Sequence, residues 1–471
     1  MSCNGNNATP PGPAIAPGVE GIDVRAAALE IGRSHGGVGV DPRLPRLVPG
    51  FDAPMFQAGL AGYSDAAMRI VARRHGAPMC VTEALLDRML LGGGRGFDKA
   101  DIALQHEQLI IENMPCGHED HPLTGQIIGS DPDEMAASAL KMIEQGARRD
   151  RDYRDMAYGE GALPGYVDTR WQSPEGTEDQ EGTKAQRHTG TQSMANGQPL
   201  QPSALRASVP LCLPSSFSVI DVNLACPVKK IDRKARGGHW LTEPTGAIDI
   251  LRAVRAAVPA AIPCSVKLRR AYDDTPEMAR NFEIIFAAAY ELGYAWTTVH
   301  ARTVEQKYIG PSRWDFLRAL VHRNPGVLVF GSGDVWEAAD VIRMVAYTGV
   351  AAVSVARGAI GNPWIFRQVR ELLAGREALP PTLEEQRGVL HQHFALSVAL
   401  HGERAAGKMM RKFGIKFAQH HPRADEVKAA MIGVNRTSDW LAVLTAHYPT
   451  AEGAPAAQAA VAEEAARVFA A

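Results

Sequence analysis

Eight short apolar runs, most of them followed by an amphipathic helical stretch, constrain the fold of this chain more than any other feature. Strands that alternate with helices form βαβ units, whose strands pair in parallel. Eight such units suffice to close a parallel sheet into a barrel, and an open doubly wound sheet is the structural alternative. We therefore predict an α/β fold built on a (β/α)8 TIM barrel. The expected strands are residues 55–60, 78–83, 123–128, 217–223, 262–268, 295–300, 326–331 and 350–355.

Segments that lack this alternation divide the chain. Residues 1–50 are rich in Pro, Gly and Asn, which predicts an irregular N-terminal extension. The barrel is expected over residues 51–375, interrupted at 147–216 by a polar insertion that we expect to be disordered or loosely packed. Residues 376–450 show helical patterns and predict a small C-terminal all-helical domain. The Ala-rich residues 451–471 are expected to form a solvated helix or tail.

Composition limits the possible partners and compartments. The formal net charge of -2 gives no global sign of a polyanionic partner, so any nucleic-acid surface has to be a local basic patch. Six cysteines in 471 residues are too sparse for a disulfide scaffold and suit a reducing compartment. The N-terminus lacks the pattern of a signal peptide, and no apolar run reaches the roughly 18 residues that span a bilayer. We therefore expect a soluble, cytoplasmic protein without a membrane partner.

Polar residues at the carboxyl ends of the expected strands indicate an active site, because in (β/α)8 barrels the site lies on that face. Cys226 follows the fourth strand and precedes Pro227, which holds its thiol on a loop. Such a thiol can donate a proton, attack an electrophile or simply fill space, and most free cysteines are buried and inert. The basic run at 229–236 could favour the thiolate, receive a polyanionic substrate or form a solvated face. The other polar residues expected on this rim are Gln126, Asn223, Lys267, Arg269, His300, Arg302, Ser332, Asp334 and Arg357.

Glycines after the seventh and eighth strands indicate a phosphate site. Gly331 and Gly333 allow the backbone to approach an anion closely, and Arg357 beside Gly358 adds a positive charge. Barrels frequently bind phosphate at this place, although the same glycines could merely shape tight turns. Lys267 lies inside an apolar run, where its ammonium is costly unless it points toward an acceptor at the barrel mouth. A phosphate-bearing cofactor such as a flavin fits both features.

Several strings of residues, in their order and spacing, carry a resemblance to a known family. The strongest are VNLACPVKKIDRKARGG, SVKLRRAYDDT, TVHARTVEQKYIGPSRWD, GSGDVWEAADV and SVARGAIGNPWIF, and AGLAGYSDAAMR, TEAL and TGQIIGSDPDEMA add to them. Together they resemble the tRNA-dihydrouridine synthase family over roughly residues 58–374, apart from the insertion.

This resemblance implies that the chain binds FMN, takes hydride from NADPH and reduces the 5,6 double bond of specific uridines in tRNA. Cys226 would donate a proton to carbon 5 of the uracil while the flavin delivers hydride to carbon 6. The uridine has to be unstacked into the pocket, since a paired base hides its ring face. By the same resemblance, the FMN contacts are Leu60, Ala61, Gln126, Lys267, His300, Ser332, Gly333, Asp334, Ala356 and Arg357.

The tRNA is expected to contact both the barrel and the helical domain. The string GKMMRKFGIKFAQHH places basic residues close together on one expected helix, a patch suited to gripping an RNA backbone without reading bases. tRNA is thus the expected partner, and the chain is expected to act as a monomer. The expected substrate contacts are Asn223, Lys230, Arg269, Arg302, Gln306, Tyr308, Arg411 and Lys412.

Other functions remain open on the residues alone. An FMN barrel dehydrogenase of a free pyrimidine or dihydroorotate would also pair a flavin with an active-site Cys, but the loop from Arg302 to Gly310 and the basic patches favour tRNA. A barrel that survives only as an RNA-binding module would keep the basic patches and lose the flavin contacts. Cys116, His118 and His121 could in principle bind a metal, but one Cys without a second ligand cluster predicts no metal site.

Overall fold

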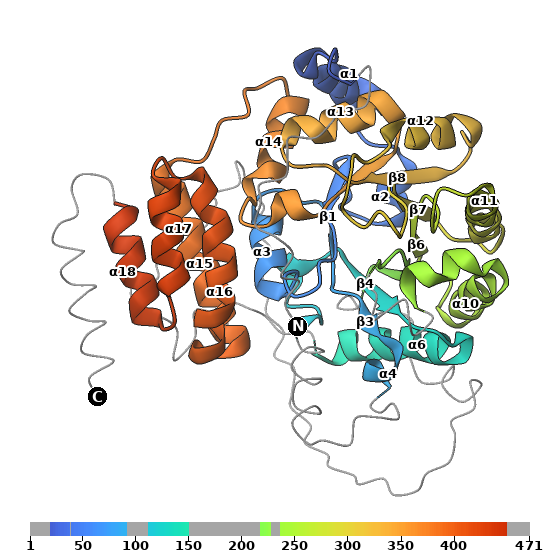
Figure 1. Ribbon diagram of the computed structural model, residues 1–471, viewed down its shortest axis with the longest axis horizontal. Coiled ribbons are helices and arrows are strands. Elements are labelled where there is room, and N and C mark those ends of the chain that lie inside the picture. The colour runs from blue at the N-terminus through green and yellow to red at the C-terminus, as the bar shows by residue number, and fades with distance from the viewer. Residues whose placement is uncertain (1–18, 38, 92–111, 150–216, 228–235, 450–471) are drawn as a thin grey trace, which may run out of the picture. The chain divides into compact units, whose positions relative to one another are not determined.

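The computed structural model describes residues 19–37, 39–91, 112–149, 217–227 and 236–449 (Figure 1). The expected substrate contact Lys230, the predicted tail at 451–471 and all but the first residues of the predicted insertion lie outside these ranges. Helix α6 continues to Arg149, so the insertion begins later than the predicted residue 147.

The strands form one closed parallel sheet, which confirms the predicted barrel and excludes the open alternative (Figure 1). Its order is β2-β1-β9-β8-β7-β6-β5-β4, and pairing of β2 with β4 completes the ring. A short extra strand, β3 (Leu85–Leu86), pairs with β4. Each predicted run overlaps one barrel strand. The barrel strands are β1 (Met55–Gln57), β2 (Cys80–Val81), β4 (Leu123–Ile128), β5 (Val219–Leu224), β6 (Cys264–Arg269), β7 (Trp296–His300), β8 (Leu328–Ser332) and β9 (Ala352–Val355).

Two of the helices that follow the strands begin at a side chain that caps them. The Asp65 carboxylate accepts a hydrogen bond from Met68 N at the start of α3, and the Thr275 hydroxyl accepts one from Met278 N at the start of α11. Pro276 stands in the first turn of α11, where no N–H is needed. The helices of the barrel are α3 (Ala66–Arg74), α4 (Asp87–Leu90), α6 (Pro132–Arg149), α10 (Pro244–Ala257), α11 (Pro276–Glu291), α12 (Trp314–Arg323), α13 (Ala338–Thr348) and α14 (Trp364–Leu373), with the 3-10 turns η1 (His118–Asp120), η2 (Gly237–Thr242) and η3 (Arg357–Ala359).

The prediction of an irregular N-terminal extension is wrong for residues 24–37 and 43–47. They contain α1 (Val24–Gly37), a helical segment with a kink near its end, and α2 (Arg43–Leu47). Leu44 of α2 and Phe51 belong to the same buried cluster as Phe330, and the rings of Phe51 and Phe330 are stacked 6.0 Å apart. Burial of apolar surface against the barrel therefore stabilises helical turns that the Pro- and Gly-rich composition did not predict.

The predicted C-terminal helices form their own buried core. A capping box between Thr382 and Glu385 starts the first of them, and the rings of Phe394 and Trp440 stack 5.1 Å apart between the first and the last. The helices are α15 (Leu383–His401), α16 (Glu403–Phe417), α17 (Ala424–Gly433) and α18 (Thr437–His447), with η4 (Ala418–His420). In the described part of the chain, no helix is both long and apolar enough to cross a membrane.

Candidate active site

The carboxyl ends of the central strands bring the expected site residues side by side. In the strand register, Asn223 of β5 pairs with Lys267 of β6, and Arg269 at the end of β6 pairs with His300 at the end of β7. His300 pairs in turn with Ser332, the last residue of β8. One continuous arc of polar side chains therefore runs along this rim, as the active-site face of a (β/α)8 barrel requires.

A chain of buried hydrogen bonds fixes the amides on β4 and β5. Asn223 Nδ2 donates to Gln126 Oε1 over 2.8 Å, and Gln126 Nε2 donates to Asp221 Oδ2 over 2.8 Å. Ser265 Oγ completes the chain by donating to Asp221 Oδ1 over 2.6 Å. The amide orientations of Gln126 and Asn223 are thus set by the network before any ligand binds.

Sequence reasoning missed Asp221 and Ser265, although a signal was present. Both stand inside strands that otherwise read as apolar, and both are buried. A carboxylate in the middle of a buried strand needs partners, and that requirement alone could have marked Asp221 as part of the site.

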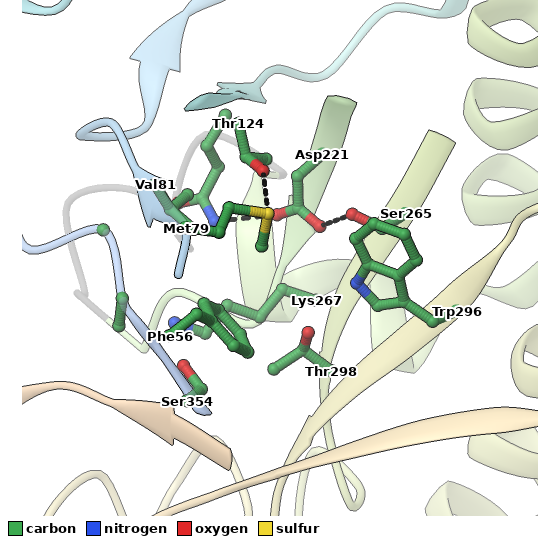
Figure 2. Close-up of a pocket in the computed structure, with 13 residues that line it drawn as sticks. Phe56, Met79, Val81, Thr124, Asp221, Ser265, Lys267, Trp296, Thr298 and Ser354 are labelled. Atoms are coloured by element: carbon green, nitrogen blue, oxygen red, sulfur yellow. Dashed lines mark hydrogen bonds between the residues drawn. The ribbon is translucent and has the colours of Figure 1, made fainter. Parts of the chain in front are cut away.

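Lys267 and Asp221 perturb each other inside the barrel. Burial raises the pKa of Asp221, although its hydrogen bonds and the nearby Lys267 oppose the shift. Burial likewise lowers the pKa of Lys267, partly offset by Asp221. Figure 2 shows both side chains lining the same small cavity, which encloses about 10 Å³, room for about one water molecule. Among the described residues, none accepts a hydrogen bond from the Lys267 ammonium, which leaves it available to an acceptor on a ligand.

His300 is held neutral by its surroundings. Burial lowers its pKa well below the usual value, and the positive charges of Arg269, Arg302, Lys267 and Arg357 add to that shift. Arg302 N donates to His300 Nδ1 over 3.2 Å, so Nδ1 is the acceptor and Nε2 carries the proton. His300 is therefore suited to donate a hydrogen bond from Nε2 and is not a source of positive charge.

Arg302 and Asp334, expected to serve different ligands, bind each other. Arg302 Nη2 donates to both carboxylate oxygens of Asp334 at 2.7 Å, and Asp334 Oδ2 also accepts from Ser312 N over 2.7 Å. Arg302 Nε donates to the carbonyl of Gly310 over 2.8 Å. The Nη1 atom of Arg302 is buried and has no acceptor among the described residues. Asp334 thus orients Arg302, and one donor of the guanidinium remains for a ligand.

The two loops predicted to hold phosphate are closely packed at their glycines. Gly333 has a φ of +110°, and a Cβ there would lie 2.3 Å from Ser312 Oγ. A Cβ on Gly358 would lie 2.5 Å from the carbonyl oxygen of Val335. Arg357 stands over the ring of Trp336, 4.5 Å from its centroid. Glycine is required at both positions, and Arg357 places an anchored guanidinium beside Gly358.

Glycines also pack against the loop that carries Cys226. The thiol is half-buried and is not in a disulfide. Gly237, with a φ of +59°, lies so close that a Cβ would be 2.8 Å from Cys226 Cβ, and Gly238 N donates to the Cys226 carbonyl over 3.1 Å. Lys267 and Arg269 lie within electrostatic reach of Cys226. The thiol is therefore fixed on a loop beside two cations of the rim.

The loop after β7 supplies the remaining expected substrate contacts. Arg269 donates from Nη1 to the carbonyls of Thr303 and Lys307, both over 2.8 Å, which ties the loop to β6. The Gln306 side chain accepts from Thr303 N over 2.9 Å and so shapes the loop from within. Tyr308 is 57% exposed, and Arg357 stands 4.8 Å from the centroid of its ring. Of these residues, Tyr308 offers the most accessible surface.

The basic residues expected to form one patch on α16 fall into two groups, exposed side chains and side chains that bond within the chain. Lys408 and Lys416 are exposed. Arg411 instead donates to the carbonyl of Val434 over 2.9 Å, and Lys412 donates to the carbonyl of Gly62 in the barrel. Helical spacing put these residues on one segment, but tertiary packing gives two of them partners within the chain.

Comparison with known proteins assigns the chain to a family. The family model described as Dihydrouridine synthase (Dus) matches residues 200–451, more than half of the chain. The chain belongs to the dihydrouridine synthase family. The match includes Cys226, strands β5 to β9 and the C-terminal helices, and it confirms the resemblance seen in the sequence.

Individual relatives agree with the family. tRNA-dihydrouridine synthase B of Shewanella oneidensis is 30% identical over 275 residues, 58% of this chain and 81% of that protein. tRNA-dihydrouridine synthase B of Escherichia coli is 31% identical over 235 residues, 50% of this chain and 71% of that protein. A probable tRNA-dihydrouridine synthase of Treponema pallidum is 36% identical over 208 residues, 43% of this chain but only 60% of that protein.

Solved structures show a more distant likeness. The complex of 2-naphthoyl-CoA reductase with 2-naphthoyl-CoA is 10% identical and covers 69% of this chain and 50% of that chain, with a TM-score of 0.40. A likeness at this level adds nothing to the family assignment.

Proposed function

We propose that this chain reduces the 5,6 double bond of specific uridines in tRNA, with FMN as cofactor, NADPH as hydride source and Cys226 as proton donor. The observation that carries the proposal is the loop after β5, where Cys226 is fixed next to the cations Lys267 and Arg269. The proposal rests as well on membership of a family whose relatives are named for this reaction.

The residues of the rim fit a bound flavin mononucleotide. Within the described part of the chain, the Lys267 ammonium has no acceptor, and neither has the buried Nη1 of Arg302. An anionic cofactor provides an acceptor for Lys267, and the glycine loops near Arg357 suit its phosphate, while Arg302 Nη1 is left for the substrate. His300 Nε2 and the Gln126 amide add neutral hydrogen-bonding groups. The residues proposed to hold FMN are Leu60, Ala61, Gln126, Lys267, His300, Ser332, Gly333, Ala356 and Arg357, with Asp334 acting by orienting Arg302.

The side chains around the cofactor site bind the substrate and deliver the proton. Bound FMN, once reduced, supplies hydride chemistry at carbon 6 of the uracil. The Cys226 thiol protonates carbon 5, and its half-buried position allows it to regain a proton from solvent. Asn223, whose amide is fixed by Gln126, is placed to hydrogen-bond the uracil edge. Tyr308, exposed and flanked by Arg357 and Arg269, offers a ring on which a base can stack and two cations for adjacent phosphates.

The helical domain is proposed to bind the RNA backbone. Lys408 and Lys416 are two exposed cations of α16, and they replace Arg411 and Lys412 as its proposed direct contacts. Backbone contacts of this kind recognise RNA shape and charge without reading bases. We further propose that the chain acts as a monomer in the cytoplasm.

The test is to incubate the purified protein with NADPH and unmodified tRNA and to map dihydrouridine by position. We expect FMN to copurify, flavin to be reduced by NADPH and dihydrouridine to form at discrete sites. A protein whose flavin is reduced but which forms no dihydrouridine would refute the function. Free uracil and dihydroorotate, assayed in parallel, test for a dehydrogenase of small pyrimidines.

The matched variant is Cys226→Ala. A general acid contributes about 10²- to 10⁴-fold, so this variant should lose that factor in uridine reduction. It should keep FMN and the reduction of the flavin by NADPH, because the thiol takes part only in the second half of the reaction. Turnover of tRNA at the wild-type rate would mean that the proton comes from another group.

A further inference from the structure

Both backbone polar groups of Gly62 are held by ionisable side chains from opposite parts of the chain. Gly62 lies in the loop between β1 and α3, with a φ of +74° that favours glycine. Its N–H donates to Glu83 Oε1 of the barrel over 2.5 Å. Its carbonyl accepts a hydrogen bond from Lys412 Nζ of α16 in the C-terminal domain. The same loop contains Leu60 and Ala61, two of the proposed FMN contacts.

Packing around Lys412 holds its ammonium at this place. Nζ lies 4.6 Å from the centroid of the Tyr63 ring and 5.3 Å from that of the Phe413 ring. These two rings meet edge to face, 5.5 Å apart, across the contact between the loop and α16. Burial lowers the pKa of Lys412, and the carboxylates of Asp65, Glu83 and Glu112 counter that effect. A cation that contacts two rings and lies within electrostatic reach of three carboxyl groups is part of the structure of this contact, not a surface charge.

A second contact fixes the end of the same loop. His401 of α15 bonds to Asp65 Oδ2 over 2.9 Å and to Glu112 Oε1 over 2.9 Å. Asp65 is also the residue that caps α3, through Met68 N. The segment from Gly62 to Asp65 is therefore attached to the helical domain at both of its ends.

We propose that Lys412 and Glu83 are positioning residues, through which the helical domain sets the geometry of the FMN-contacting loop after β1. This inference rests on the proposed function, since it assigns the loop to the cofactor. Glu83 holds the Gly62 N–H from the barrel side, and Lys412 holds the carbonyl from the helical side. Loss of either side chain should make the backbone at Leu60 and Ala61 more mobile, without changing the Cys226 loop or the glycine loops after β8 and β9.

The test compares Lys412→Met with Lys408→Met, one helical turn earlier on α16, where the lysine is exposed. Three properties are measured: FMN affinity of the apoprotein by flavin fluorescence, amide exchange of residues 60–64, and kcat and KM for tRNA. Lys412→Met should weaken FMN binding about tenfold or more, as expected for loss of a hydrogen bond to a charged group, and should speed exchange at 60–64. Lys408→Met should keep wild-type FMN affinity and exchange and raise only KM for tRNA. Lys412→Arg, which keeps a cationic donor, should restore most of the FMN affinity.

The outcomes separate this inference from the proposed function. Glu83→Ala removes the other hydrogen bond to Gly62 and should show the same loss of FMN affinity and the same faster amide exchange at residues 60–64. This variant keeps the inference testable if Lys412→Met fails to fold. Wild-type FMN affinity and exchange in Lys412→Met would overturn the inference, as would an effect confined to KM for tRNA. A wild-type protein that binds FMN but forms no dihydrouridine would refute the function alone, because affinity and exchange do not depend on turnover.

Discussion

Replacing His401 with glutamine should remove one pH-dependent contribution to the free energy of unfolding of this protein. Burial by itself lowers the pKa of His401, but its hydrogen bonds to Asp65 and Glu112 and the negative charge of those carboxylates outweigh burial and raise that pKa to about 9. The side chain is only 2% exposed, so its charge is little screened by solvent. His401 therefore stays protonated between its two carboxylates well above the pH at which a free histidine loses its proton.

The size of the effect follows from the difference between the folded and unfolded pKa values. With an unfolded value of about 6.5, the shift is about 2.5 pKa units, or about 3 kcal/mol of the free energy of unfolding. Because the folded pKa is the higher one, this stabilisation is complete below about pH 6.5. It is lost as the pH rises through about 9.

The assay is urea unfolding of wild type and His401→Gln at about pH 6 and about pH 10. We expect the wild type to be more stable at the lower pH by about 3 kcal/mol relative to the variant, and this advantage to be almost gone at the higher pH. The control is His322→Gln on α12, where the histidine is exposed. The difference in free energy of unfolding between this variant and wild type should be the same at both pH values. A His401→Gln penalty that does not change with pH would refute the reasoning, because it would show that charge on His401 contributes nothing.

Two further predictions concern buried charges. Lys267→Met should raise the stability of the FMN-free protein, measured by thermal unfolding, because it removes a buried ammonium that has no acceptor among the described residues. The same variant should weaken FMN binding, and a loss of stability together with unchanged FMN affinity would contradict this prediction. Asp120→Asn should lower the free energy of unfolding by about 3 to 5 kcal/mol in urea titrations. Arg69 and Asp120 form a fully buried ion pair at 2.6 Å, and the variant leaves the Arg69 guanidinium uncompensated. A cost under about 1 kcal/mol would show that the hydrogen bonds from Arg69 to backbone carbonyls suffice to stabilise it.

The strands and the rim could be predicted from sequence because they depend on local pattern. Strand β5, Val219–Leu224, is mostly apolar and rich in β-branched residues, which is the composition of parallel strands buried on both faces. Once the strand ends are known, the topology of a barrel puts Asn223, Lys267 and His300 on one face. Their juxtaposition in the register follows from the fold class alone.

The partners of the charged side chains could not be predicted in this way. Arg302 and Asp334 are 32 residues apart, and nothing in their neighbouring residues indicates that one orients the other. The same holds for Lys412, whose acceptor Gly62 is 350 residues away. A helical pattern predicts which residues share a face but not what that face meets.

The amino-acid sequence by itself determined the barrel, the C-terminal helices, the family and the position of Cys226, because these depend on periodicity and on motifs short enough to be read along the chain. Tertiary structure alone decided that Leu44 and Phe51 join the aromatic core around Phe330, that Asp221 anchors the amide network, and that Lys412 binds the barrel. The physical reason is that a buried charge or an apolar helix face is stable only with a complementary partner. That partner is supplied by segments that chain folding, not sequence proximity, brings into contact.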